Sequence, residues 1–186
     1  GVQTCALPIS ISMTQHISKF CPEVRWITMY AFSTENWSRP DWEKKALFQL
    51  MERYCDDFFS WAVGKLIIKF LGDLDDERLP ASLKNRLKNL EVKSGYALEG
   101  TSKSEQPLTL CIAINYGGRK DIIQATKNIV EAVGRGEYNI HDINEDIFHS
   151  CLSTAGMPSP ELVIRRSEEH TSELQSHSDL VCRLLL

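Results

Sequence analysis

A dense run of polar and aromatic residues follows one apolar stretch of the chain. It reads Ser33-Thr34-Glu35-Asn36-Trp37-Ser38-Arg39 and brings hydroxyls, a carboxylate, an amide, an indole and a guanidinium into one short segment. A cation near the start of a helix opposes the helix dipole unless an anion is also bound there. Arg39 and neighbouring backbone N–H groups therefore indicate a phosphate or diphosphate site. The alternative is a plain loop in which Ser38 caps the next helix and Trp37 fills the core.

Two further places could bind an anion. The Gly117-Gly118 pair precedes a predicted helix and could cradle a phosphate, although such a pair also simply permits a tight turn. Arg165 ends a predicted strand, where it is either an anion clamp or a solvated charge. No histidine lies at metal-ligand or triad spacing, and the six cysteines form no C-x-x-C pair. The sequence therefore indicates neither a zinc site nor a disulfide framework.

The elements that must position these residues follow from the apolar pattern. Runs rich in β-branched and aromatic residues predict strands over 26–32, 66–72, 108–115 and 161–165. Apolar residues three and four apart predict helices that end near 22, span 41–64, follow 80, and span 119–133 and 144–153. This alternation predicts an α/β fold, a parallel sheet with helices on both faces.

The predicted sheet also says where a ligand would bind. Ligands of parallel sheets lie beyond the carboxyl ends of the strands. Three places qualify, namely residues 33–39, the turn at 115–119, and Arg165. We therefore expect these segments to meet at one edge of the sheet.

Composition restricts the class of protein. The chain has 186 residues, 42% of them hydrophobic and 25% charged, with a formal net charge of -4. These values are typical of a single soluble domain with a packed core. No local cluster of Lys and Arg indicates a nucleic-acid partner, and no apolar run approaches the roughly 20 residues that span a bilayer. An anionic ligand would have to be held by a few placed side chains.

Both ends of the sequence depart from the rest. The opening GVQTCALPI and the stretch 166–186 read as translated sequencing-adapter DNA in opposite orientations. We therefore predict a partial domain over 10–165, truncated at both ends, with adapter-derived, non-native peptide at 1–9 and 166–186. The alternative is a natural, divergent tail.

The motifs MYAFSTENWSRP, FLGD, INYGGRKDI and PELVIR occur in this order, and with them the chain resembles the cis-prenyltransferase family of the undecaprenyl diphosphate synthase type. The resemblance implies a Rossmann-like α/β transferase. Such an enzyme adds isopentenyl diphosphate units in cis to an allylic prenyl diphosphate and so makes a polyprenyl diphosphate.

The resemblance also implies roles for single residues. It assigns Asn36 to the proton-removal step as the catalytic residue. Because a neutral amide is a poor base, we interpret Asn36 as a group that orients substrate or relays the proton. The substrate-binding residues that it implies are Ser33, Thr34, Glu35, Trp37, Arg39 and Arg165.

The resemblance implies Mg²⁺ as cofactor, but the magnesium-binding Asp and Glu of the family are missing from this sequence, so we name no metal-binding residue. We expect the polypeptide as written to lack transferase activity. Implied partners are the two diphosphate substrates, a second copy in a homodimer, no nucleic acid, and a membrane surface met through the lipid product. The implied location is the cytoplasm or the plastid stroma.

Two other functions remain open. The chain could be a non-catalytic partner subunit of a cis-prenyltransferase complex, although the polar set at 33–39 has no evident use in such a subunit. It could also be an unrelated Rossmann-like phosphate binder, which the missing glycine fingerprint disfavours.

Overall fold

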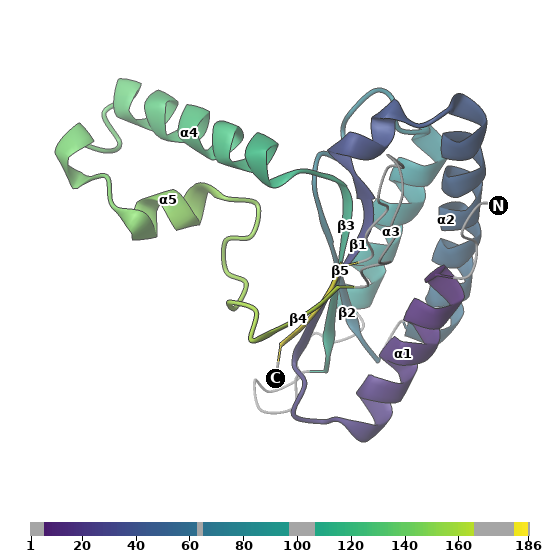
Figure 1. Cartoon of the computed structure of the whole chain (residues 1–186). Helices are drawn as coiled ribbons and strands as arrows, with labels where there is room; N and C mark the ends of the chain where they lie inside the picture. Colours follow the sequence, from purple (N-terminus) through teal and green to yellow (C-terminus); the bar gives the residue numbers. More distant parts are fainter. Residues whose placement is uncertain (1–5, 63–64, 97–106, 166–180, 186) are drawn as a thin grey trace, which may run out of the picture.

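A computed structural model describes residues 6–62, 65–96, 107–165 and 181–185 of the chain. Its helices and strands alternate along the sequence (Figure 1). In chain order they are α1 (Ala6–Phe20), β1 (Trp26–Ser33), the 3-10 helix η1 (Thr34–Ser38), α2 (Asp41–Ala62), β2 (Ile67–Leu71), α3 (Ala81–Tyr96), β3 (Thr109–Tyr116), α4 (Gly118–Gly134), the 3-10 helix η3 (Ile140–Asp142), α5 (Glu145–Cys151), β4 (Leu162–Arg165) and β5 (Val181–Leu185).

The strands form one sheet in the order β2-β3-β1-β5-β4. β3 lies between β2 and β1 and pairs in parallel with both. The predicted α/β fold with a parallel sheet is therefore confirmed. β5 is antiparallel to β1 and to β4, and it comes from the stretch 166–186 that the sequence assigns to adapter-derived peptide. Likewise α1 begins at Ala6, before the predicted start of the domain at residue 10.

The core lies between the sheet and the first three helices. Alternate residues of β1, such as Ile27 and Met29, point toward these helices and are buried. α3 contributes Leu83, Leu87 and Leu90, each at most 1% exposed. Full burial of such a side chain contributes about 1.5–3 kcal/mol. Burial of these residues therefore stabilises the packing of the helices on this face of the sheet.

The other face of the sheet differs from the prediction of helices on both faces. α4 and α5 pack against each other and extend away from the sheet (Figure 1). Ala125 and Ile129 of α4 are buried. In contrast, Ile122, Ile123 and Val130 of the same helix are each more than half exposed. A helical pattern predicts that one face of a helix is apolar, but it does not predict which element covers that face. For this reason the sequence predicted α4 to pack on the sheet.

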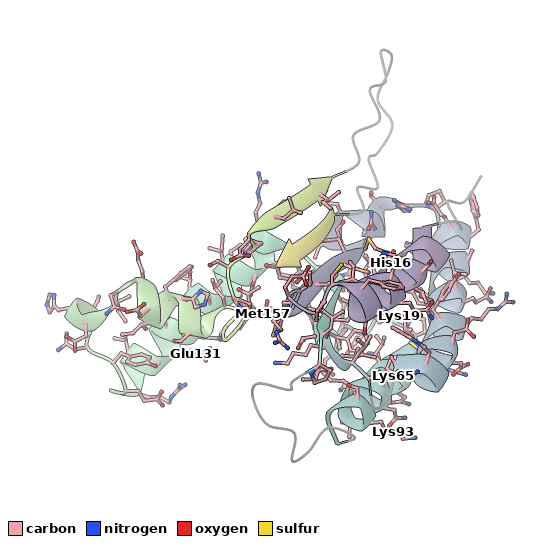
Figure 2. All side chains as sticks on the ribbon, turned by 90° about the horizontal axis from the view of Figure 1, so that it is seen from below. His16, Lys19, Lys65, Lys93, Glu131 and Met157 are labelled. Carbon is pink, nitrogen blue, oxygen red and sulfur yellow. The ribbon has the colours of Figure 1, made fainter. Side chains whose placement is uncertain are left out.

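A short segment after α5 covers part of this second face. Met157 packs there against a small cluster around Leu71, Cys111 and Ala113. Seen from below, Met157 lies at the junction between the sheet and the pair of helices that carries Glu131 (Figure 2). Among the described residues, no helix has the length and apolarity to cross a membrane.

Candidate functional site

The carboxyl ends of the three parallel strands meet at one edge of the sheet. Strand register places Ser33 of β1 beside Tyr116 of β3, and Leu71 of β2 beside Ala113 of β3. The segments that follow these strands are therefore neighbours. The expectation that residues 33–39 and 115–119 lie together is confirmed.

Two glycines allow the strand ends to approach each other closely. A Cβ at Gly72, whose φ is +113°, would lie 2.1 Å from the carbonyl oxygen of Ile114. A Cβ at Gly117 would lie 2.3 Å from Thr34 Oγ1. Gly117 precedes α4 as its N-cap residue. Gly117 thus serves the close contact between β3 and the segment after β1, whereas a Cβ at Gly118 would meet no atom within 4 Å. Neither glycine has the positive φ that a glycine-specific turn would require.

The polar run after β1 forms a 3-10 helix, η1, which the sequence did not predict. The carbonyl oxygen Oδ1 of Asn36 accepts a 2.8 Å hydrogen bond from the backbone N–H of Ser33. Ser38 donates from Oγ to the carbonyl oxygen of Glu35 at 2.8 Å, so it closes η1 and does not cap α2. Glu35 itself is exposed. The turn therefore holds the candidate catalytic amide in a fixed orientation.

Trp37 packs against the core and also lines a cleft, while its implied role in substrate binding stays a prediction. Its ring packs against Phe32 and Phe48, with centroids 5.0 and 5.8 Å apart, so it extends the core as the loop interpretation predicts. Its indole Nε1 donates a 2.7 Å hydrogen bond to Oδ1 of Asn115 at the end of β3. Because the indole is only partly buried, its remaining surface borders an open cleft.

Arg39 is paired within the chain. Its Nη1 lies 2.7 Å from Oε1 of Glu43, one turn further along, and the two side chains are 17% and 25% exposed. The carboxylate of Glu43 therefore supplies the negative charge that a cation beside a helix N-terminus requires. Binding of a diphosphate at Arg39 would have to compete with Glu43 or share the guanidinium with it.

Residues from the loop after β2 complete the site, and the sequence singled out only the FLGD motif at its start. Asp76, whose side chain is 10% exposed, accepts hydrogen bonds from Arg78 Nη2 at 2.6 Å and Nε at 2.9 Å. The bond from Arg78 is the main cause that holds the pKa of Asp76 well below its usual range, although burial opposes it. Asp76 is thus a fixed negative charge beside the strand ends.

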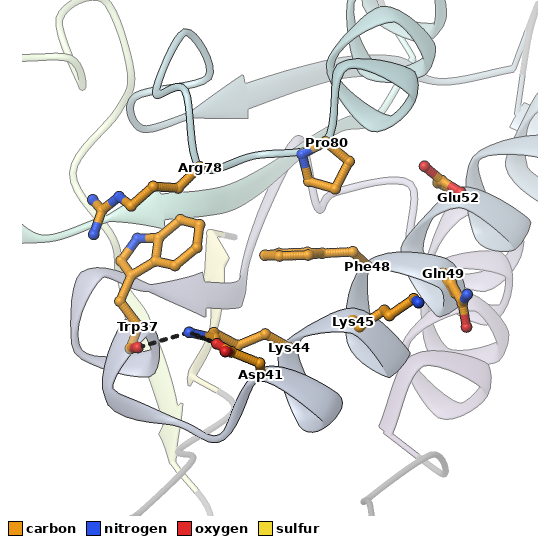
Figure 3. A pocket seen from close by; sticks show the side chains of 9 residues that line it. All are labelled: Trp37, Asp41, Lys44, Lys45, Phe48, Gln49, Glu52, Arg78 and Pro80. Carbon is orange, nitrogen blue, oxygen red and sulfur yellow. Dashed lines mark hydrogen bonds and ion pairs between the residues drawn. The ribbon is translucent and has the colours of Figure 1, made fainter.

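An open cleft of about 550 Å³ lies between α2 and the segment that leads into α3. Trp37, Phe48 and Pro80 give it an apolar wall, and Arg78 and Lys44 lie beside that wall (Figure 3). The remaining lining residues are Asp41, Lys45, Gln49 and Glu52. An apolar surface bordered by cations suits a molecule with an apolar chain and an anionic head.

The last predicted site residue lies further along the sheet. Arg165 ends β4, and β5 separates β4 from β1. β4 runs in the same direction as β1, because both are antiparallel to β5. The backbone of Arg165 is therefore at the same edge of the sheet as Ser33, while its side chain lies outside the described residues.

The described residues do not offer a ready metal site. Within them, no group of three or more His, Cys, Asp or Glu side chains is arranged to hold a metal ion. Two carboxylates of the loop after β2 are already paired, Asp73 with Lys120 and Asp76 with Arg78. This donor set does not fit Mg²⁺, which prefers open carboxylate ligands.

Comparisons with known proteins agree with the fold and the motifs. The family model described as "Putative undecaprenyl diphosphate synthase" matches residues 10–173. The chain is 38% identical over 147 residues to an isoprenyl transferase of Clostridium perfringens and 41% identical over 147 residues to a ditrans,polycis-undecaprenyl-diphosphate synthase of Micrococcus luteus. These matches cover 78% of this chain and 54% and 55% of the relatives. The chain thus spans about half the length of the curated relatives it matches.

Two solved structures are similar to this fold. Lavandulyl diphosphate synthase from Lavandula x intermedia superposes with a TM-score of 0.69 at 24% identity, over 82% of this chain and 60% of that one. A Campylobacter jejuni protein described as a "probable undecaprenyl diphosphate synthase" gives 0.61 at 26% identity, over 77% and 63%. The relatives are named as transferases, which does not favour a non-catalytic partner subunit. The resemblance seen in the motifs is confirmed, and the chain belongs to the undecaprenyl diphosphate synthase family of cis-prenyltransferases.

Proposed function

We propose that the protein to which this chain belongs is a transferase that adds isopentenyl diphosphate units in cis to an allylic prenyl diphosphate. The observation that carries the proposal is the family match over residues 10–173, which includes the polar run at the end of β1. A relative from Micrococcus luteus is named as a farnesyl-diphosphate-specific synthase. An allylic diphosphate such as farnesyl diphosphate is therefore the first substrate to test.

The residues proposed to bind substrate are Ser33, Thr34, Glu35, Trp37, Arg39 and Arg165. Arg39 is the strongest candidate for a contact with diphosphate, because its planar guanidinium can donate two parallel hydrogen bonds to one phosphate. Its present partner is Glu43 at 2.7 Å. Exchange of this carboxylate for a diphosphate keeps the guanidinium paired, so the net gain in binding free energy is smaller than for an unpaired arginine.

Asn36 is proposed as the residue that acts at the reacting atoms. Its Oδ1 already accepts from the backbone of Ser33, which leaves the Nδ2 amide group to donate. A donor cannot remove a proton, so Asn36 would orient the substrate or stabilise the diphosphate that takes the proton. The hydrogen bond to Ser33 would fix the direction in which the amide points.

Mg²⁺ is proposed as the cofactor of the whole protein. When bound, it would neutralise charge that develops on the departing diphosphate. Since the described donor set does not fit the ion, no step is assigned to residues of this chain through it. We further propose that the protein forms a homodimer, acts in the cytoplasm or plastid stroma, and meets a membrane surface through its lipid product.

Equilibrium titration of the chain with farnesyl diphosphate tests the substrate proposal. Arg39→Gln should weaken binding by about tenfold, the low end of the about 1.5–3 kcal/mol that a hydrogen bond to a charged group contributes, because Arg39 exchanges Glu43 for the diphosphate. Glu43→Gln should strengthen binding, since it removes the competing carboxylate. Arg135→Gln is the matched control, because Arg135 is exposed on the far end of α4 and pairs with Glu137.

The proposal fails if farnesyl diphosphate binds no better than farnesol, or if the Arg39 and Arg135 variants have equal affinity. Incorporation of labelled isopentenyl diphosphate into a longer prenyl chain tests catalysis separately. Binding without incorporation is the expected result for this chain, because the carboxylates of its described residues do not fit Mg²⁺.

A further inference from the structure

A closed ring of side chains surrounds the indole of Trp37. Its Nε1 donates to Asn115 Oδ1 at 2.7 Å, and Asn115 Nδ2 donates to Asp76 Oδ2 at 3.1 Å. Asp76 in turn accepts two hydrogen bonds from the guanidinium of Arg78. The ring closes where it began, because the guanidinium carbon of Arg78 lies 4.2 Å from the centroid of the Trp37 ring (Figure 3). Both the edge and the face of the indole are therefore held.

Asn115 connects Trp37 to Asp76 in this ring, and it is 1% exposed. Its φ is 53°, and no other non-glycine residue in the described ranges has a positive φ. Such a conformation is unfavourable for most residues and persists only where the surroundings enforce it. Its amide nitrogen also donates to the carbonyl oxygen of Asp73 at 2.8 Å. Its amide oxygen and nitrogen both have partners, so the amide has a single consistent orientation.

Asp76 links the neutral and the charged halves of the ring. Its carboxylate accepts from an amide on one side and from a guanidinium on the other, in a position where its side chain is 10% exposed. Loss of this carboxylate would leave the Asn115 amide without that acceptor and would release Arg78 from its bidentate pair. Both contacts that hold the indole would then weaken together.

We propose that Asn115, Asp76 and Arg78 are positioning residues that fix the orientation of the Trp37 indole and thereby the shape of the cleft that receives the isoprenoid diphosphate. The inference rests on the proposed function, which assigns Trp37 to substrate binding. The indole lines the cleft together with Phe48 and Arg78. A rotation of the indole would therefore change the apolar wall without altering Arg39 or Asn36.

The first experiment measures Trp37 itself, without any ligand. The near-ultraviolet circular dichroism of each variant is compared with that of the same variant carrying Trp37→Phe, so that the difference isolates one of the four tryptophans. Asp76→Asn should change this difference spectrum. Asp75→Asn is the matched control, because Asp75 is the adjacent residue with the same side chain but pairs with Lys88 at 2.8 Å on the surface.

A second variant tests the same role in a chain that is expected to remain folded. Asn115→Gly removes the amide but suits the positive φ of this position, so it should remain folded and still change the Trp37 signal. An unchanged Trp37 spectrum in both Asp76→Asn and Asn115→Gly would overturn the positioning role, whatever the ligand.

The second experiment titrates each variant with farnesyl diphosphate. Asp76→Asn and Asn115→Gly should weaken binding about tenfold, whereas Asp75→Asn should stay within about twofold of the unaltered chain. A changed Trp37 spectrum with unchanged affinity would overturn the link between indole orientation and binding. Absence of binding in the unaltered chain would refute the proposed function, and the ligand-free spectra would then still decide the positioning role.

Discussion

A methyl group added at Gly117 should destabilise the fold, because it meets the side chain of Thr34. Gly117 has φ -150°, an extended conformation that any residue adopts, so alanine causes no backbone strain there. The new Cβ would lie 2.3 Å from Thr34 Oγ1 and 3.1 Å from Thr34 Cγ2. The destabilising part of the effect of Gly117→Ala therefore comes from this one contact between Gly117 and Thr34.

The size of the effect follows from two opposing contributions. Overpacking of a tight contact costs about 1–3 kcal/mol. Replacement of glycine by alanine lowers the entropy of the unfolded chain, which stabilises the fold by about 0.4–1 kcal/mol. We therefore expect Gly117→Ala to lower the free energy of unfolding by about 1–2 kcal/mol. Thr34→Ala removes both clashing atoms and leaves only its Cβ, 3.3 Å away, so it should rescue most of the loss.

Urea denaturation followed by far-ultraviolet circular dichroism measures the coupling between Gly117 and Thr34 as a double-mutant cycle. The cycle compares the unaltered chain, Gly117→Ala, Thr34→Ala and the double variant. Gly118→Ala is the control, because a Cβ at Gly118 meets no atom within 4 Å and alanine favours helix at the start of α4. Equal stability of the Gly117 and Gly118 variants would refute the reasoning. So would a coupling energy below about 0.5 kcal/mol, the usual scatter for independent sites.

Three further predictions concern stability and thiol chemistry. Gly72→Ala should lower the free energy of unfolding in urea by about 3 kcal/mol or more, since φ is +113° and the clash is with the Ile114 backbone; equal stability would contradict this. Because Arg78 lowers the pKa of Asp76, Asp76 stabilises the fold above its unfolded pKa of about 4, and that contribution is lost as pH falls toward the lower folded-state value. Asp76→Asn should therefore flatten the acid limb of a thermal-melt pH series below about pH 4. Burial raises the pKa of Cys111 to about 12, so mass spectrometry should find Cys151, which is partly exposed, alkylated before Cys111 at pH 8.

The strands and most helices could be predicted because their signals are local. The apolar run predicted over 108–115 is β3, Thr109–Tyr116, and the helix predicted over 41–64 is α2, Asp41–Ala62. A pattern of apolar residues reports burial, and burial on both faces is what a central parallel strand experiences. The convergence of the strand ends followed from this fold class alone.

The side-chain ring could not be predicted in the same way. Trp37 and Asn115 are 78 positions apart, and no local pattern relates an indole to an amide at such a separation. The sequence placed Asn115 at the end of the predicted strand 108–115, at the start of the turn at 115–119 and in the motif INYGGRKDI, but gave it no partner. Asparagine tolerates the left-handed region better than most residues, so the residue type agrees with the positive φ, but the hydrogen-bond partners of Asn115 depend on the sheet register.

Four of the cations around the candidate site share one property that bears on how it would bind a diphosphate. Each of the four has a carboxylate partner in the described part of the chain, in the pairs Arg39–Glu43, Lys44–Asp41, Arg78–Asp76 and Lys120–Asp73. A bound diphosphate would replace or share these partners, so its charge alone would contribute little net free energy. Affinity must then depend on geometry, namely the fork of Arg39 and the fixed face of the Trp37 indole. This makes the orientation of one tryptophan more important for recognition than the number of positive charges nearby.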